Sequence, residues 1–363
     1  MSLSPDITEV LARARADLRM GVPVVLQGDE TAMLVIAAET LSDARLADLR
    51  TLPGSPVLAI TARRAETLKA RAYDGDLARV VIPADAGRAW IDSIADPADD
   101  LNSPMKGPLK SLRDGSANMA RLAIQLTKSA RLLPAAVLMD VADGADFAAT
   151  HALTHVQVAD AGVQMDAASP MHSIVSARLP LQVSEAGRLH VFRPEDGADE
   201  HYAVEIGRPN REEPVLSRLH SACFTGDLLG SLKCDCGPQL RGALSQMGHE
   251  GAGILLYLNQ EGRGIGLANK MRAYSLQDQG FDTVEANHRL GFEDDERDFR
   301  IGADILRRLG FSSVRLLTNN PAKIAMMQQN GIDVAERVPL KVGENHHNEG
   351  YLATKAAKSG HML

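Results

Sequence analysis

The sequence predicts an α/β protein of two domains, each a mixed β-sheet flanked by helices. A chain of 363 residues is long enough for two domains of ordinary size, each with its own core. In the first half, short apolar runs typical of strands alternate with helical patterns such as 118–129. Around residues 173–189 the pattern changes, and from Val215 onward the polar residues are dense. We therefore predict domains at 1–176 and 177–363.

Individual elements of this fold are expected at defined places. The amino terminus has the pattern of an amphipathic helix, and residues 92–110, rich in Pro, Asp, Asn and Gly, predict an irregular loop. The apolar runs that predict strands are 22–26, 57–60, 80–83, 135–139, 189–194 and 253–258.

Composition and charge restrict the class of partner. Hydrophobic residues make up 45% of the chain and charged residues 24%, as in soluble globular proteins. The net charge of −8 gives no reason to expect a nucleic acid or a membrane as partner. No apolar run approaches the about 20 residues of a membrane span, and the amino terminus lacks a signal-peptide pattern. We expect a small-molecule substrate and a cytoplasmic location.

The three cysteines form one cluster, with the spacing C-x10-C-x-C at Cys223, Cys234 and Cys236. An odd, clustered set argues against disulfides, and thiolates are ligands that suit zinc. Three ligands leave one tetrahedral position for water, whose pKa an open zinc site lowers to about 7. Two alternatives remain: a closed structural zinc with His220 or His249 as fourth ligand, and three thiols without metal. The neighbouring motifs favour the catalytic interpretation.

A glycine-rich run, 260–267, follows the apolar run 253–258. Glycines after a strand let backbone N–H groups approach an anion, and Arg263 can bind phosphate with two hydrogen bonds. Glu261 is a natural acceptor for the N1–H and the exocyclic amine of guanine. The alternative is a glycine-rich turn with a solvated Glu–Arg pair.

Residues 316–323 have the form of a strand, a polar turn and a helix start, with Asn320 as cap and Pro321 at the first helical position. In this arrangement Thr318 and Lys323 would face any ligand bound at the start of the helix. A well-formed helix entry without a ligand explains the same pattern.

The charged run 293–298 is a solvated surface or a place where a carboxylate beside an arginine acts as a base. Spacing alone does not choose between the two. Tyr274 lies on a predicted helix, where most tyrosines cap a core.

Together these segments resemble GTP cyclohydrolase II, the enzyme that starts riboflavin synthesis. The resemblance runs from about residue 218 to 363 and rests on HSACFTGD, the cysteine pattern, NQEGRGIGL, AYSLQDQGFDTVEANHRLGFEDDERDF, LLTNNPAK, ERVPL and NEGYLATKAAKSGHML. It implies conversion of GTP and water to 2,5-diamino-6-ribosylamino-4(3H)-pyrimidinone 5′-phosphate, formate and pyrophosphate.

The resemblance also implies residue roles. One zinc per chain would be held by the three cysteines, and its hydroxide would attack C8 of guanine. Tyr274 matches a tyrosine needed for ring opening, Asp295 the general base, and Arg297 a residue acting at the α-phosphate. Mg²⁺ is expected with the triphosphate. Nucleotide-binding positions fall on Arg218, Gln239, Glu261, Arg263, Thr283, Thr318 and Lys323.

Two positions depart from the family pattern. The family commonly has Glu where this chain has Ala222, and Arg where it has Asn259. Neither is a metal-binding or catalytic position, so the departures bear on nucleotide affinity.

The first half resembles 3,4-dihydroxy-2-butanone 4-phosphate synthase through GVPVV, LVIAAE and AIQLTKSARLLPAAV. The acidic metal-binding run of the synthase is shortened here to 28–31, and its R-x-G-H-T-E motif aligns with 116–121, where those chemical groups are missing. We expect a catalytically silent domain that keeps its fold and a dimer interface.

The leading interpretation is a homodimeric, monofunctional GTP cyclohydrolase II. One alternative is a GTP-hydrolysing paralogue of another pathway, or one that stops at a partly processed product. A second is a zinc-stabilised nucleotide-binding regulator, against which Tyr274, Asp295 and Arg297 argue.

Overall fold

The computed structural model describes residues 3–345 and residue 348. The carboxy-terminal motif that begins at Asn348 otherwise lies outside the described residues. Within the described part of the chain, every helix is too short or too polar to cross a membrane.

The chain forms two compact units that are not continuous in sequence. Their segments are Met1–Ala167 with Ala268–Glu296 in the first unit, and Ala168–Leu267 with Arg297–Leu363 in the second. The boundary near residue 177 divides the chain by sequence resemblance and stays a prediction. When the chain is divided into compact units instead, residues 268–296 belong to the first unit.

The first unit is built on a six-stranded sheet with the order β4-β3-β5-β2-β1-β6. All neighbouring strands are antiparallel except β1 and β6, which are parallel. The four-residue turn 28–31 joins β1 to β2. The strands are β1 (Val24–Gln27), β2 (Ala32–Ala37), β3 (Val57–Thr61), β4 (Leu77–Val81), β5 (Ala135–Val141) and β6 (Thr154–Gln157).

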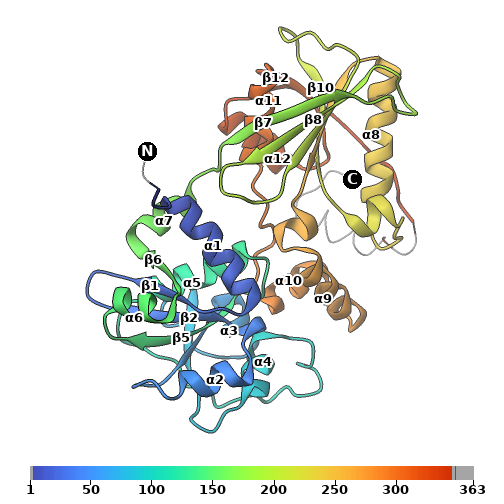
Figure 1. Cartoon of the computed structure of the whole chain (residues 1–363). Helices are drawn as coiled ribbons and strands as arrows, with labels where there is room; N and C mark the ends of the chain where they lie inside the picture. Colours follow the sequence, from blue (N-terminus) through green and yellow to red (C-terminus); the bar gives the residue numbers. More distant parts are fainter. Residues whose placement is uncertain (1–2, 346–347, 349–363) are drawn as a thin grey trace. The chain divides into compact units, whose positions relative to one another are not determined.

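Helices cover both faces of this sheet, and each face has its own core (Figure 1). Side chains alternate along a strand, so Val24 and Leu26 belong to one core and Val25 to the other. The first core also contains residues of α1, α5 and α7, and the second contains residues of α2, α3, α4 and α6. These helices are α1 (Ile7–Met20), α2 (Asp43–Leu49), α3 (Ala62–Thr67), α4 (Arg88–Ala95), α5 (Asn118–Ser129), α6 (Gly144–His151) and α7 (Val158–Asp166).

Two further helices of the first unit come from the middle of the chain: α9 (Leu267–Asp278) and α10 (Thr283–Leu290). Asp282 starts α10 with a reciprocal capping box to Glu285. Gly291 ends it in the left-handed conformation, at φ +90°, where a side chain would be strained.

The second unit contains a seven-stranded sheet with the order β13-β12-β10-β11-β9-β8-β7. The strands from β13 to β11 run parallel, and those from β11 to β7 are antiparallel to their neighbours. The strands are β7 (Met171–Arg178), β8 (Gly187–Pro194), β9 (His201–Ile206), β10 (Val215–Ser221), β11 (Gly253–Leu258), β12 (Ser313–Leu317) and β13 (Asp333–Val338).

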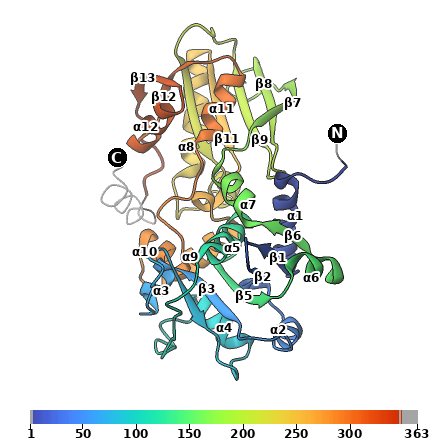
Figure 2. The same cartoon turned by 90° about the vertical axis from the view of Figure 1, so that its left-hand side faces the viewer.

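Helices lie on both faces of this sheet as well (Figure 2). On one face α11 (Arg300–Arg308) and α12 (Pro321–Gln329) contribute to a core with Leu219 and Leu256. On the other face α8 (Cys236–Glu250) packs against alternate residues of the same strands, such as Leu255. The α/β prediction, with two mixed sheets flanked by helices, is confirmed.

Most predicted elements are found close to their expected positions. The helix at 118–129 is found with those bounds, and the predicted strands correspond to β1, β3, β4, β5, β8 and β11. The strand expected at 80–83 begins three residues earlier, at Leu77. The loop expected at 92–110 is irregular only after α4, which extends to Ala95.

Candidate functional site

The cysteine cluster lies where β10 ends and α8 begins. Cys223 follows β10 and precedes a π-helical turn, η2 (Phe224–Leu228), and Cys236 is the first residue of α8. The three Sγ atoms lie within 4.8 Å of one another, and those of Cys223 and Cys234 are 3.7 Å apart. Two thiolates each about 2.3 Å from a tetrahedral zinc are separated by about 3.8 Å. The distance between the sulfur atoms of Cys223 and Cys234 therefore matches that of two zinc-bound thiolates.

Two glycines make room for the sulfur atoms. A Cβ on Gly226 would lie 2.7 Å from Sγ of Cys234 and 3.0 Å from Sγ of Cys223. A Cβ on Gly237 would lie 2.1 Å from the carbonyl oxygen of Gly226. Because real Cβ atoms do not approach other atoms so closely, η2 and the start of α8 meet only if both positions are glycine.

Crowding of the thiols makes their ionisation costly in the chain alone. Hydrogen bonding to Cys223 and Cys234, followed by burial, raises the pKa of Cys236 well above its ordinary value. The pKa of Cys234 is raised as well, first by its contact with Cys223. A bound cation removes this penalty because it stabilises thiolates directly. The donor set thus fits a soft divalent metal.

Asp227 organises the backbone beneath the cluster. One carboxylate oxygen, Oδ2, accepts hydrogen bonds from the Cys223 backbone N–H and the Tyr257 hydroxyl, each at 3.0 Å. Nε2 of His220 lies 3.1 Å from both carboxylate oxygens. Asp227 was not among the residues predicted from the sequence. The available signal was an acid four residues after a ligand cysteine, within HSACFTGD.

Neither histidine considered as a fourth ligand takes part in the cluster. The group of potential ligands found among the described residues contains the three cysteines and no histidine. Nε2 of His220 faces Asp227, and burial lowers the pKa of this imidazole. His249 lies thirteen residues beyond Cys236 on α8, which is about 20 Å at helical rise. Among the described residues, neither closed alternative, with His220 or with His249 as fourth ligand, is therefore supported.

Residues expected to bind nucleotide follow the parallel strands at their carboxyl ends. Glu261 comes after β11, while Thr318 comes after β12. The parallel strands β11, β10 and β12 end at the same edge of the sheet. Cys223, which follows β10, lies at this edge as well. Ligands of open α/β sheets bind at this edge. The topology thus places these groups beside the cysteine cluster.

Arg218 is a buried cation within this region. Its Nη1 donates to the carbonyl of Leu317 at 3.0 Å, and its Nη2 donates to Oε1 of Gln239. Gln239 in turn donates to Asp235. Burial lowers the pKa of Arg218 to about 10, which leaves the guanidinium charged at neutral pH.

The glycine-rich run forms a tight 3₁₀ turn, η3 (Glu261–Gly264), after β11. Gly262 and Arg263 both have left-handed backbone conformations, at φ 64° and 61°. Oε2 of Glu261 accepts from the Phe224 N–H at 2.5 Å, and Oε1 accepts from the Gly262 N–H at 3.0 Å. Glu261 thereby fixes η3 against η2, the turn that follows Cys223.

Two cations share one aromatic ring near the end of β10. Nζ of Lys323 lies 5.0 Å from the ring centre of Phe299, and Cζ of Arg297 lies 4.8 Å from it. Lys323 is buried and donates to the Leu219 carbonyl at 2.9 Å. Arg297 reaches Ser221 at 3.4 Å. The pair concentrates positive charge, which would attract an anion to this end of the strand.

The helix entry expected after β12 is confirmed. The side chain of Asn320 accepts from the Ala322 N–H at 2.9 Å, and Pro321 occupies the first turn. Thr318 is buried, and its hydroxyl accepts from the Asn320 N–H at 3.0 Å.

Three expected site residues belong to the first unit: Tyr274, Thr283 and Asp295. Tyr274 lies on α9 with Nζ of Lys270 5.7 Å from its ring centre. Thr283 is the first residue of α10 and accepts from Nε2 of Gln277 at 3.3 Å. Asp295 follows α10 in the charged run. The other ten expected residues belong to the second unit.

Comparison with known proteins identifies the family. Residues 172–339 match the family GTP cyclohydrolase II. A GTP cyclohydrolase-2 of Azospirillum brasilense is 44% identical over 358 residues, which cover 97% of this chain and 93% of that protein. The chain belongs to the GTP cyclohydrolase II family. It is accordingly an enzyme, and a hydrolase.

Other relatives match about half of the chain. A GTP cyclohydrolase-2 of Shigella boydii is 60% identical over 164 residues, covering 45% of this chain and 84% of that protein. Among solved structures, a two-domain 3,4-dihydroxy-2-butanone 4-phosphate synthase from A. baumannii covers 92% of this chain and 99% of its own, at 19% identity and a TM-score of 0.33. That score is too low to support an inference.

The two departures from the GTP cyclohydrolase II pattern have defined surroundings. Asn259 donates from its side chain to the Glu200 carbonyl, and its N–H donates to Nδ1 of His201 at 3.0 Å. Ala222 donates its N–H to the Leu258 carbonyl at 2.7 Å. Asn259 therefore ties the start of the glycine-rich run to β9.

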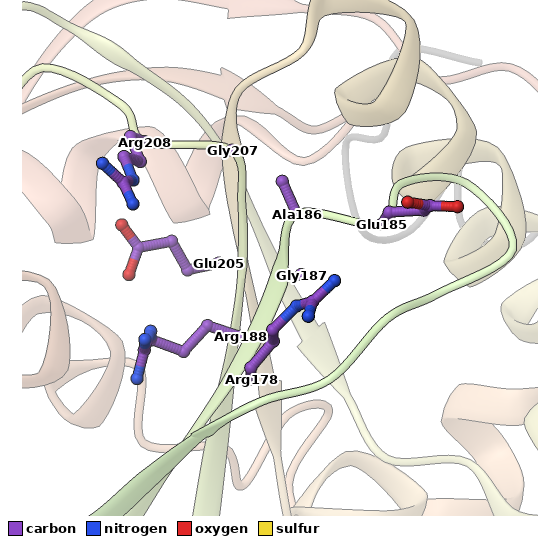
Figure 3. Close-up of a pocket in the computed structure, with 8 residues that line it drawn as sticks. All are labelled: Arg178, Glu185, Ala186, Gly187, Arg188, Glu205, Gly207 and Arg208. Carbon is purple, nitrogen blue, oxygen red and sulfur yellow. The ribbon is translucent and has the colours of Figure 1, made fainter.

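A pocket of about 350 Å³ occurs elsewhere in the second unit, at the ends of β7, β8 and β9 (Figure 3). None of the residues that the family resemblance selects lines it. Its lining residues are Arg178, Glu185, Ala186, Gly187, Arg188, Glu205, Gly207 and Arg208.

We predict that Gly226→Ala lowers the metal content of the purified enzyme well below that of the wild type. The added methyl group would push Cys234 and Cys223 apart, because its Cβ lies 2.7 and 3.0 Å from their sulfur atoms. The zinc content per chain can be measured by elemental mass spectrometry, and the accessibility of the thiols by their reactivity with a thiol reagent. Gly162→Ala is the control, since a Cβ there meets nothing within 4 Å. Full zinc occupancy in Gly226→Ala would contradict the prediction.

Proposed function

We propose that this enzyme uses zinc to hydrolyse GTP to 2,5-diamino-6-ribosylamino-4(3H)-pyrimidinone 5′-phosphate, formate and pyrophosphate, at the start of riboflavin synthesis. The observation that carries the proposal is the cluster of three thiols, with two sulfur atoms 3.7 Å apart, at the carboxyl edge of the parallel strands. Family membership supports the same substrate, since the relatives are named GTP cyclohydrolase-2.

Cys223, Cys234 and Cys236 would hold the metal, and the ion when bound supplies a water of lowered pKa and a positive charge. The chain supplies the frame for this chemistry. Asp227 fixes Cys223 through its backbone N–H, and Gly226 leaves space for the sulfur atoms.

The remaining groups of the second unit suit a guanine nucleotide. The carboxylate of Glu261 can accept from the N1–H and the amine of guanine in place of its present backbone donors. Arg218, Arg297 and Lys323 are cations that can balance the charge of a triphosphate. Gln239, Arg263 and Thr318 are proposed as further nucleotide contacts. Mg²⁺ is proposed as a companion of the triphosphate.

The three residues of the first unit are proposed to act on the same substrate. Asp295 would accept a proton, Tyr274 would assist ring opening through its hydroxyl, and Thr283 would contact the nucleotide. Arg297, two residues after Asp295, would stabilise charge at the α-phosphate when pyrophosphate leaves. The homodimeric state stays a prediction.

We predict that the purified enzyme converts GTP, in the presence of Mg²⁺, to the three named products, and that mass spectrometry detects each of them. Cys234→Ser and Cys236→Ser replace a soft ligand by a hydroxyl that zinc binds poorly, so zinc content and turnover should fall together. Turnover that persists in zinc-free variants would contradict zinc catalysis. A product that retains its formyl group would support partial processing instead.

We predict that Tyr274→Phe loses at least about a hundredfold in kcat while keeping its zinc, because the change removes only the hydroxyl. Asp295→Asn and Arg297→Ala should behave in the same way. Tyr202→Phe is a matched control in β9 and should turn over GTP like the wild type. Wild-type kcat in Tyr274→Phe would remove that residue from the mechanism.

We further propose that the first domain has no synthase activity. At the position of the shortened acidic run, a Cβ on Gly28 would lie 2.8 Å from Cε of Met119, so an apolar side chain packs against this turn. Arg121, also in the aligned motif, is paired with Asp76 at 2.6 Å. A thioether and a paired guanidinium do not bind the hard cation that such chemistry uses.

Incubation with ribulose 5-phosphate and Mg²⁺ is therefore expected to yield neither formate nor a four-carbon phosphate above the no-enzyme background. An active synthase assayed in parallel controls the detection. Formation of both products by this enzyme would show that the motif lies elsewhere in the first domain.

A further inference from the structure

Residues 268–296 interrupt the second unit in sequence but are compact with the first. This segment carries Tyr274, Thr283 and Asp295. Its contacts with residues 3–167 occur along its whole length and involve side chains from several elements of the first unit.

The contacts of α9 centre on Arg272. Its Nη2 lies 3.0 Å from Oε1 of Glu39, and its Nε lies 3.1 Å from Oδ2 of Asp96. Glu39 is itself fixed, because its other oxygen accepts from the Leu133 N–H at 2.8 Å. Asn269, which is fully buried, donates to the Arg131 carbonyl at 3.2 Å. The part of α9 that carries Asn269 and Arg272 is thus bound to the first domain. Arg272 lies two residues before Tyr274.

The end of α10 is anchored inside the first unit. The hydroxyl of Thr61 donates to the carbonyl of Gly291 at 2.8 Å in a buried hydrogen bond. A Cβ on Gly291 would lie 2.8 Å from that hydroxyl and 2.9 Å from Cγ of Pro134, so the approach is as close as the chain permits. Leu290 and Phe292, on either side of Gly291, are both 1% exposed.

The charged run is held by two cations of the first domain. Nη2 of Arg63 lies 2.8 Å from Glu293, and Nζ of Lys128 lies 2.6 Å from Glu296. The hydrogen bond from Arg63 lowers the pKa of Glu293. Oε1 of Glu296 also accepts from the Glu293 N–H at 2.9 Å, which closes the run into a loop. Asp295 lies inside this loop.

We infer that the first domain serves the cyclohydrolase reaction as the scaffold that orders residues 268–296, and thereby holds Tyr274, Thr283 and Asp295 in their working conformations. The inference rests on the proposed function for the roles of these three residues. Lys128 is a positioning residue, which acts on Asp295 through Glu296.

The two ion pairs of the charged run differ in how exposed they are, and so in how much they are expected to contribute to stability. The Arg63–Glu293 pair is exposed, and such pairs contribute about 0–1 kcal/mol. The Lys128–Glu296 pair is more buried, with both side chains 23% exposed, and Lys128 also lies over the ring of Phe292. Reversing the charge of Lys128 places two carboxylates together beside Asp295, which should open the loop.

The experiment uses the full-length zinc-loaded enzyme. Lys128→Glu should speed hydrogen–deuterium exchange in peptides from 281–296 and lower kcat for GTP about tenfold or more, at unchanged zinc content. The exchanged pair Lys128→Glu with Glu296→Lys should restore both. Arg121→Glu is the matched control, because it reverses a charge on the same helix, α5, but breaks a pair with Asp76 outside the segment.

If Lys128→Glu does not fold, Lys128→Met keeps the aliphatic stem and removes only the charge, with the same expected direction and a smaller effect. Exchange in 281–296 that matches the wild type in these variants would overturn the inference. Faster exchange with wild-type kcat would overturn it as well, since positioning would then not matter to the reaction. Failure of the proposed function is separate: it is seen when the wild type forms no product, or when Tyr274→Phe remains active.

Discussion

The parallel pairing of β10 with β11 and with β12 is the constraint on which the candidate site depends. Since these strands run in the same direction, the chain leaves all three at one edge of the sheet. The first cysteine, the glycine-rich turn and the capped start of α12 each follow one strand end. Groups separated by up to a hundred residues are brought together by this register alone. The buried hydrogen bond from Arg218 to Leu317 links two of the strands directly.

Around this frame, close backbone approaches determine the geometry of the thiols. η2 can meet the start of α8 only because Gly226 and Gly237 lack side chains. The resulting crowding disfavours thiolates in the empty chain, and a cation reverses that balance. Binding of a metal at this cluster would therefore be coupled to ionisation of its thiols.

Local patterns in the sequence were sufficient for most elements and for the cysteine cluster. The cap at Asn320, the helix at 118–129 and the close spacing of the thiols depend on neighbours in the chain, which a sequence displays directly. Asp227 was missed because its hydrogen-bond partners include Tyr257, thirty residues away. The membership of residues 268–296 in the first unit was also out of reach. It arises from pairs such as Arg272 with Glu39, more than two hundred residues apart, which no periodicity reveals.

The discontinuous second unit affects how the protein can be divided. The chain passes between the compact units at three points, after Ala167, after Leu267 and after Glu296. A single proteolytic cut near residue 170 would therefore not release either unit, because two covalent connections would remain. A fragment that begins at residue 177 would carry α10 without Thr61 and Pro134, the residues that Gly291 approaches most closely. Such a fragment would keep the sequence of residues 268–296 but none of the contacts that these residues make with residues 3–167.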